Sequence, residues 1–171
     1  MTLVGSEPTV WLASYKGPAE GLLYNTTHQV IKRVTRSIYS HSEAVILGKG
    51  YSSSERDGGV RKKDINFRDG KWDYIPVPWV KAADVLGLYN RTDGDDYDFW
   101  GLRLFLGIDA PEDEKKWWCS EWVATAFQMP DTRISPGELH KVAQERYFGW
   151  MAAQGAGYDS KFFRPVQGHN L

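Results

Sequence analysis

Apolar and polar residues follow patterns typical of short strands and one helix in the first part of this chain. Residues 9–15 are rich in β-branched and aromatic side chains and end before Gly17-Pro18, which predicts a strand. In residues 25–38, apolar residues recur at helical spacing behind a start rich in N-cap side chains. We therefore expect a helix of about three turns before residue 41.

The middle third of the chain predicts further strands. The apolar run at residues 44–47 breaks at Gly48-Lys49-Gly50 and resumes at residues 51–54, the pattern of a β-hairpin with a glycine-containing turn. Residues 60–67 and 71–77 are expected to form two more strands, joined by a turn at residues 68–70.

Beyond Pro78 the pattern becomes helical. Apolar residues within 80–88 fall near helical spacing, and another helix is predicted over 99–106. A third helix is expected to begin at Cys119. The segment Ser135-Pro136-Gly137-Glu138 has the form of a capping box with proline at the first helical position, so it predicts one more helix start.

Length and composition indicate one compact domain. The chain has 171 residues, of which 42% are hydrophobic, enough for a core of its own. We expect the domain to cover residues 1–171, with residues 130–171 as a helical and irregular extension. Basic residues number 21 and acidic residues 22, so the formal net charge of -1 provides no general attraction to nucleic acid or anionic lipid.

The sequence leads us to expect an intracellular protein, or one exported by an unusual route. A single cysteine excludes an internal disulfide, and residues 1–7 lack the basic start and apolar run of a secretory signal. No apolar stretch reaches the roughly 18 to 20 residues that a membrane-spanning helix needs.

Cys119, the only cysteine, lies where a nucleophile would be expected. Free cysteines are often core residues, and Trp117, Trp118 and Trp122 surround this one in the sequence. A helix N-terminus favours the other interpretation, because its unpaired N–H groups stabilise a thiolate and bind an oxyanion. The residue and its neighbours leave both interpretations open.

His41 is the candidate base, since it heads an apolar strand at the point where a sheet would leave the core. Strand periodicity puts Glu43 on the same face, and a hairpin turn near Gly48 would place Glu55 opposite His41 and Ser53 diagonal to it. Each of these three side chains is a candidate to orient the imidazole, while a solvated strand face is the plainer interpretation of both glutamates. The other histidines are interpreted as surface residues: His28, His140 and His169.

The sequence predicts no metal and no cofactor. One cysteine and four scattered histidines lack the close ligand pairs of zinc sites. The glycines at 48–50 and 58–59 lack the lysine-serine ending of a phosphate-binding loop. The acidic run at 93–98 lacks the downstream glutamate of a calcium loop.

Three short motifs occur in a distinctive order: Ser40-His41-Ser42-Glu43, then Tyr97-Asp98, then Cys119-Ser120-Glu121-Trp122-Val123. Together they resemble the circularly permuted branch of the NlpC/p60 papain-like superfamily, the YiiX/YaeF-like proteins, in which the histidine strand precedes the cysteine helix. The resemblance covers residues 10–129. It implies an α+β papain-like fold, an antiparallel sheet packed against helices with the nucleophile at a helix N-terminus. A second resemblance, to proteins encoded near bacteriophage structural genes, implies a virion-associated location as an alternative to the cytoplasm.

Carried over residue by residue, the resemblance implies Cys119 as nucleophile and His41 as general base. It implies Tyr97 as a hydroxyl that lines the cleft and supports the oxyanion site. Glu121 matches the family pattern too, and at that place we expect it to cap the helix.

The third group departs from the family pattern. Relatives carry a polar residue on the strand after the histidine, and the matching position here is near Ser53. Serine orients an imidazole less strongly than a carboxylate does, so Glu55 and Glu43 remain alternatives.

The resemblance implies a cysteine hydrolase, a peptidase or amidase that works through an acyl-enzyme. Bacterial cell-wall peptides are the first substrate class that it implies. One alternative is an acyltransferase or lipid-ester hydrolase of the same fold. Another is a catalytically inactive binding module or phage structural module.

Overall fold

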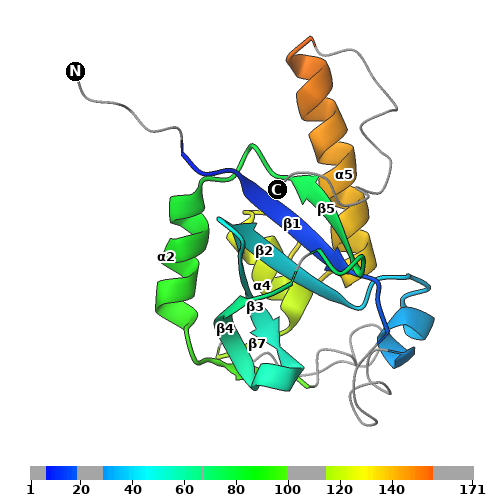
Figure 1. Ribbon diagram of the computed structural model, residues 1–171, viewed down its shortest axis with the longest axis vertical. Helices are drawn as coiled ribbons and strands as arrows, with labels where there is room; N and C mark the ends of the chain where they lie inside the picture. Colours follow the sequence, from blue (N-terminus) through cyan, green and yellow to red (C-terminus); the bar gives the residue numbers. More distant parts are fainter. Residues whose placement is uncertain (1–6, 19–28, 67, 100–114, 156–171) are drawn as a thin grey trace.

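A seven-stranded sheet in the order β5-β1-β2-β3-β4-β6-β7 forms the centre of the molecule (Figure 1). The computed structural model describes residues 7–18, 29–66, 68–99 and 115–155. The strands are β1 (Val10–Tyr15), β2 (His41–Ile46), β3 (Lys49–Ser54), β4 (Gly59–Asp64), β5 (Trp72–Pro76), β6 (Asp96–Tyr97) and β7 (Lys116–Trp117).

Neighbouring strands are antiparallel from β5 to β6, whereas β7 runs parallel to β6. The expected antiparallel sheet is therefore correct for most of its width and wrong at the β7 edge, where the sheet is mixed. Residues 98–115 separate β6 from β7, which is long enough for the crossover that a parallel pair requires. Strands of two residues carry no periodic signal, so the sequence did not predict either of them.

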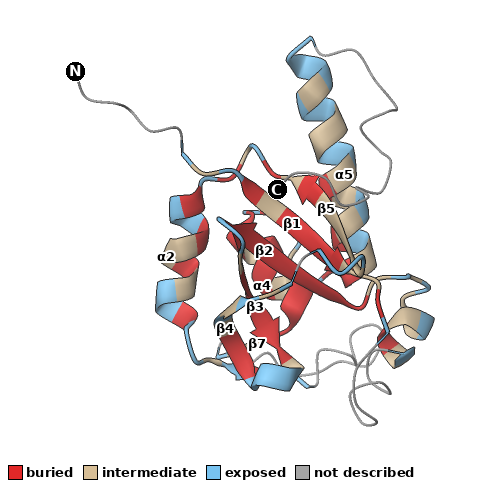
Figure 2. Cartoon of the chain, in the orientation of Figure 1, coloured by how far each residue is buried: buried red, intermediate tan, exposed pale blue. Residues whose placement is uncertain are grey.

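The helices α2 (Ala82–Thr92), α4 (Cys119–Ala126) and α5 (Pro136–Ala153) pack around this sheet. Helix α4 lies against β2 and β3, behind the sheet in the view of Figure 1, and α5 lies against β1 and β5. One face of the strands supplies Leu12, Ala44 and Val60 to the same core as Trp122 and Phe127 of the α4 region. Figure 2 shows the result: buried residues concentrate in the strands and α4, and the outer sides of α2 and α5 are exposed. The predicted α+β class is confirmed.

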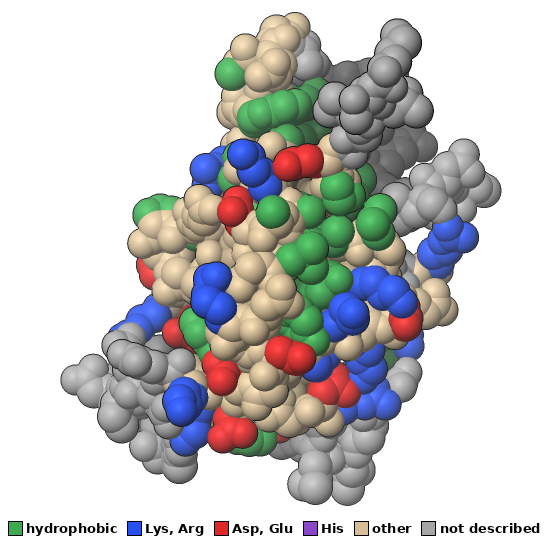
Figure 3. All heavy atoms as spheres, turned by 90° about the vertical axis from the view of Figure 1, so that its left-hand side faces the viewer, with side chains coloured by type: hydrophobic (Ala, Val, Ile, Leu, Met, Phe, Trp, Pro, Cys, Tyr) green, Lys and Arg blue, Asp and Glu red, His purple; other side chains and the backbone are tan. Residues whose placement is uncertain are grey.

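Charged side chains of both signs surround a band of hydrophobic side chains on the side of the molecule that carries α2 (Figure 3). This mixture agrees with the net charge of -1. Among the described residues, none of the helices has the length and apolar character needed to cross a bilayer.

The β2–β3 hairpin is present, but its turn lies earlier than the glycines suggest. Ile46 pairs with Lys49, so the turn consists of Leu47 and Gly48, both with positive φ (49° and 75°). This is the geometry of a tight hairpin turn, which glycine and asparagine favour and leucine does not. The sequence therefore pointed to a turn one residue too late.

That difference changes which side chains share a face. Ala44 pairs with Tyr51, and continuing this register places Ser52, not Ser53, opposite Glu43. Ser53 pairs with Val60, a core residue, so its side chain points to the helix-covered face of the sheet. The expected diagonal placement of Ser53 beside His41 is wrong, because a shift of one residue reverses the face of every side chain in a strand.

Helix α5 is integrated into the fold and is more than an extension. Ser135 caps it, its hydroxyl accepting a hydrogen bond from the Glu138 amide at 3.2 Å as the sequence predicted, and Leu139 and Ala143 enter the core. His140, expected on the surface, is half-buried. Its Nδ1 lies 2.9 Å from the Ser14 hydroxyl, and its ring stacks on Tyr39. These contacts tie α5 to β1.

Most of the remaining predicted strands and helices are confirmed, and the others lie outside the described residues. Strands over 10–15, 59–64 and 72–76 and helices over 82–92 and 119–126 match the expected segments within a few residues. Residues 29–34 are helical, as predicted for the end of the first helix. The helix expected over 99–106 and the histidines at 28 and 169 lie outside the described residues, apart from residue 99.

Candidate active site

Cys119 is the first residue of α4, as the sequence predicted. The backbone N–H of Trp118 donates to Oε2 of Glu121 at 3.2 Å, so the glutamate caps the helix in the expected way. The first helical hydrogen bond runs from the amide of Trp122 to the carbonyl of Trp118, which leaves the amides between them without a partner in the helix. Those amides belong to Cys119, Ser120 and Glu121, in the first turn of the helix.

Two hydrogen bonds fix the start of α4 in the fold. The Ser120 hydroxyl donates to the carbonyl of Ile134 at 2.6 Å, in the segment that leads into α5. The indole N–H of Trp122 donates to the Thr92 hydroxyl at 2.9 Å, at the end of α2. Both donors are fully buried, so the helix N-terminus is held rigidly.

Cys119 lies in a small apolar cluster with Ile31, Tyr97 and Trp118. The cysteine is 1% exposed and Tyr97 is 5% exposed. Tyr97 thus stands beside the cysteine, where the resemblance expects a cleft-lining hydroxyl. The side chain of Cys119 is therefore almost fully buried.

His41 connects the cysteine to a buried carboxylate. Its imidazole lies within hydrogen-bond reach of the Cys119 thiol, although the two residues are 78 positions apart in the chain (119 minus 41). Its Nε2 lies 2.7 Å from Oε1 of Glu43, which leaves Nδ1 as the ring nitrogen for the sulfur. Trp72 meets the imidazole edge-on, with ring centroids 6.3 Å apart. Cysteine, histidine and glutamate form a continuous chain of contacts.

Glu43 is fully buried and ion-paired on a second side. Nη1 of Arg61 donates to Oε2 of Glu43 at 2.8 Å, and Nη2 of Arg61 binds Oε1, a two-pronged contact. The same arginine reaches Oδ2 of Asp57 through Nε at 2.9 Å, and Lys63 also pairs with Asp57. Because each buried charge has an opposite charge in contact, the carboxylate can remain ionised without water around it.

The surrounding charges shift the pKa values of His41 and Glu43 in the directions that keep both side chains ionised. Burial lowers the pKa of His41, but the negative charges of Cys119 and Glu43 outweigh it and raise that pKa to about 9. Burial raises the pKa of Glu43, but the positive charges of Arg61 and His41 outweigh it and lower that pKa to about 2. At neutral pH the imidazole is therefore protonated and the carboxylate charged.

The other two candidates for the third group lie elsewhere. The Ser53 hydroxyl is buried and has no hydrogen-bond partner in the part of the chain that the structure describes. Glu55 begins the short 3-10 helix η1 (Glu55–Asp57), directly after β3. Nε2 of His41 instead donates to Glu43, the alternative that strand periodicity puts on the face of His41. Arg61 was missed; its position one strand beyond β3 depends on the register of two strand pairs.

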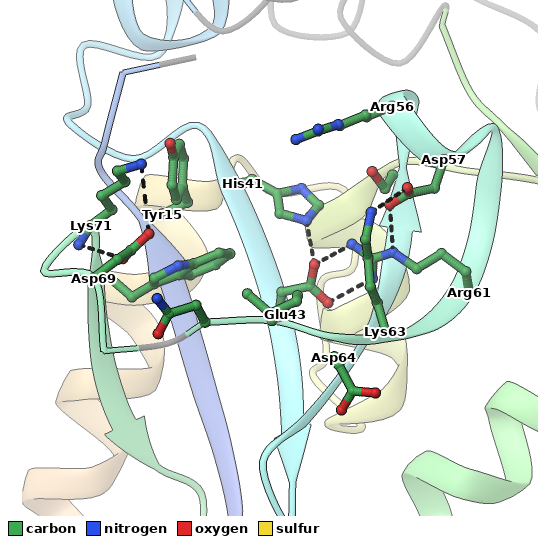
Figure 4. Close-up of a pocket in the computed structure, with 14 residues that line it drawn as sticks. Tyr15, His41, Glu43, Arg56, Asp57, Arg61, Lys63, Asp64, Asp69 and Lys71 are labelled. Atoms are coloured by element: carbon green, nitrogen blue, oxygen red, sulfur yellow. Dashed lines mark hydrogen bonds and ion pairs between the residues drawn. The ribbon is translucent and has the colours of Figure 1, made fainter. Parts of the chain in front are cut away.

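A polar cavity of about 240 Å³ opens next to His41 and Glu43. Figure 4 shows its walls: Tyr15 on one side, Arg61 and Lys63 on the other, and Arg56 at the rim. His41 and Glu43 thus border a space that a substrate group can occupy, whereas Cys119 is not among the residues that line it.

Compared with known proteins, the chain matches no family model, and no curated protein is significantly similar to it.

Proposed function

We propose that this chain is a cysteine hydrolase of the permuted papain-like type, acting on a peptide or amide bond. One observation carries the proposal: a cysteine at a helix N-terminus contacts a histidine whose far nitrogen is held by a buried, ion-paired glutamate. Acyl transfer through a thiol requires a nucleophile, a base that contacts it, and a group that orients the base. Cys119, His41 and Glu43 are in contact in this order.

The proposed reaction starts from an ion pair of the Cys119 thiolate and the His41 imidazolium. In this pair the proton of the thiol has moved to His41, whose raised pKa favours the charged imidazolium at neutral pH. The sulfur of Cys119 then attacks the carbonyl carbon, and amide groups at the start of α4 stabilise the oxyanion that forms. His41 gives its proton to the leaving nitrogen as the C–N bond breaks. Water, deprotonated by His41, next hydrolyses the thioester and restores the thiolate.

Glu43 has an orienting role in this mechanism. It fixes the ring of His41 through Nε2 and compensates the positive charge of the imidazolium. Arg61 in turn keeps Glu43 ionised and fixes both of its oxygens. The peptides of bacterial cell walls remain the first substrate class, on the resemblance of the His, Tyr-Asp and Cys-Ser-Glu motifs.

A small activated ester tests the proposal without knowledge of the natural substrate. With p-nitrophenyl acetate, we expect a burst of nitrophenolate, an acetyl group on Cys119 by mass spectrometry, and slow turnover. Cys119→Ala and His41→Ala should remove the burst, and circular dichroism should show that both variants remain folded. A burst of equal size in His41→Ala would refute the proposed pair. Acetylation without any turnover would favour a module that has kept the site and lost the activity.

One observation favours hydrolysis or transfer of a lipid acyl group as a second candidate. A cavity of about 590 Å³ on the open face of the sheet is lined by Trp11, Val45 and Tyr74, and it shares Ile65 and Asn66 with the cavity beside His41. Its size and apolar walls suit a small-molecule ligand. If an acyl chain binds there, p-nitrophenyl decanoate should acylate Cys119 faster than the acetate, and Val45→Lys should abolish that preference.

A further inference from the structure

Among the described residues, one basic side chain of the cavity beside His41 has no acidic partner. Each acidic residue of its lining contacts a basic residue: Glu43 with Arg61, Asp57 with Arg61 and Lys63, Asp64 with Lys49, and Asp69 with Lys71. Arg56 also lines the cavity, and it makes no hydrogen bond or ion pair within the residues that the structure describes. A positive charge in excess is therefore left at the rim.

The rim that carries Arg56 has a fixed geometry. Arg56 is the middle residue of η1, and Gly58 closes this turn with a φ of 87°, a conformation that glycine adopts without strain. Asp57, the next residue, is bound by Arg61 and Lys63 of β4. Figure 4 shows the guanidinium of Arg56 extending from this turn over the cavity toward His41.

We propose that Arg56 binds a carboxylate of the substrate, next to the imidazole of His41. The proposal rests on the proposed hydrolase function and narrows its substrate class to peptides or amides with an anionic group near the scissile bond. A guanidinium presents two parallel N–H donors that match a carboxylate, and an arginine without an internal partner loses no ion pair when it binds one.

The dimensions and the surroundings of the cavity agree with this ligand. A volume of about 240 Å³ lies just below the range of sites that enclose a whole drug-sized ligand, so the cavity suits one group of a larger substrate. Since the acids of the lining are already paired, they leave the charge of Arg56 available to attract an anion. The imidazole of His41, which is protonated at neutral pH, lines the same cavity and adds a second positive charge.

Two alkylating reagents that differ in charge test the proposal, because the chain has a single cysteine. Iodoacetate carries a carboxylate and iodoacetamide does not, and glutathione provides the rate ratio of a free thiol. We expect the ratio of iodoacetate to iodoacetamide rates at Cys119 to exceed that of glutathione. In Arg56→Gln this ratio should fall by about fivefold at low salt, as expected for one partly exposed charge contact. Arg56→Lys should keep part of the preference.

Arg91→Gln is the matched control, because Arg91 is exposed in the last turn of α2 and does not line the cavity. Its rate ratio should equal that of the wild type. An unchanged ratio in Arg56→Gln, or an equal fall in Arg91→Gln, would overturn the proposal. The iodoacetamide rate alone reports on the activation of Cys119, so a failure of the proposed hydrolase site appears there and not in the ratio.

A second measurement does not depend on access to the buried thiol. N-acetylalanine and its amide differ only in the carboxylate, and each is titrated into the protein while the ring signals of His41 are followed by NMR. N-acetylalanine should shift the signals of the wild type but not those of Arg56→Gln, and the amide should shift neither. Equal shifts of the His41 signals from N-acetylalanine and its amide would contradict recognition of a carboxylate. Shifts that inorganic phosphate causes and N-acetylalanine does not would contradict it as well.

Discussion

Nε2 of His41 lies 2.7 Å from Oε1 of Glu43, two residues further along the same strand. Alternate residues of a strand share a face, so β2 alone brings the imidazole and its carboxylate together. The cysteine and the arginine come from α4 and β4. Strand β2 therefore fixes the histidine–carboxylate half of the site, and the packing of α4 and the pairing through β3 supply the rest.

Replacing Glu43 by glutamine should weaken the activation of Cys119. The amide keeps the shape of the side chain but loses the charge that helps to hold His41 protonated. We expect the alkylation rate at pH 6.5 to fall by about tenfold, as for loss of one strong charge–charge contact. The rate of the reaction with iodoacetamide measures this, and Glu55→Gln, which changes a neighbouring glutamate in η1, should leave it within twofold of wild type. A larger fall in the alkylation rate of Glu55→Gln than of Glu43→Gln would show that Glu55, and not Glu43, orients His41.

The Glu43–Arg61 pair should show strong energetic coupling. Removing one partner leaves the other charge in a buried position, and we expect Glu43→Gln to lower the free energy of unfolding by roughly 2–3 kcal/mol. This is below the usual cost because Arg61 keeps Asp57 as a partner. Urea unfolding of both single variants and of Glu43→Gln/Arg61→Gln should give a double variant more stable than the sum of the single effects predicts. Additive effects would mean that the two residues act independently.

The dependence of stability on pH follows from the two shifted pKa values. The pKa of Glu43 is lowered to about 2 in the folded protein, so its contribution is present above its unfolded pKa of 4.5 and is lost as pH falls toward 2. The pKa of His41 is raised to about 9, so its contribution is present below 6.5 and is lost as pH rises through 9. The melting temperature, measured across pH, should therefore fall as the pH drops below 4.5 and as it rises above 6.5.

The variant Cys119→Ser measures how much the sulfur contributes to the raised pKa of His41, and so to stability at alkaline pH. Serine has no negative charge at these pH values, so the pKa of His41 should fall in this variant while the acid side of the stability profile remains as in wild type. The ring signals of His41, assigned by their loss in His41→Asn, report the pKa directly by NMR. A titration of His41 near 6.5 in the wild type would show that the sulfur and the carboxylate do not act on it as described.

Ser53→Ala should have little effect. The hydroxyl faces the core, has no hydrogen-bond partner within the described residues, and lies on the face opposite Glu43. We expect unchanged alkylation kinetics and a free energy of unfolding equal to or slightly above that of wild type, because a buried unpaired hydroxyl is costly. A loss of thiol reactivity comparable to that of Glu43→Gln would show that Ser53 takes part in orienting His41.

Much of the fold was predictable because its signals are local. The start of α5 at Ser135 and the start of α4 at Cys119 follow from capping residues and apolar spacing within a few positions. The β2–β3 hairpin also follows from alternation, but its register does not. Leu47 has a positive φ that its side chain disfavours, and only the pairing of the whole hairpin reveals this.

The candidate site divides in the same way. Cys119 and His41 were found from residue type and position, and Glu43 from strand periodicity as one of three alternatives. Choosing among the three required the register, since a shift of one residue exchanges Ser52 and Ser53 between the two faces. Arg61 contacts Glu43 across β3, and a contact that spans two strand pairs leaves no local pattern in the sequence.

The proposed ion pair of Cys119 and His41 can be tested by the pH dependence of the iodoacetamide rate, because Cys119 is the only cysteine and its modification needs no substrate. We expect the rate at pH 6 to stay within a few fold of the rate at pH 8.5, since a thiolate paired with a protonated histidine persists below the pKa of about 8.5 of a free thiol. In His41→Ala the rate at pH 6 should fall at least tenfold below that of wild type. A wild-type rate that falls about a hundredfold between pH 8.5 and pH 6, as for a free thiol, would contradict an ion pair of Cys119 and His41.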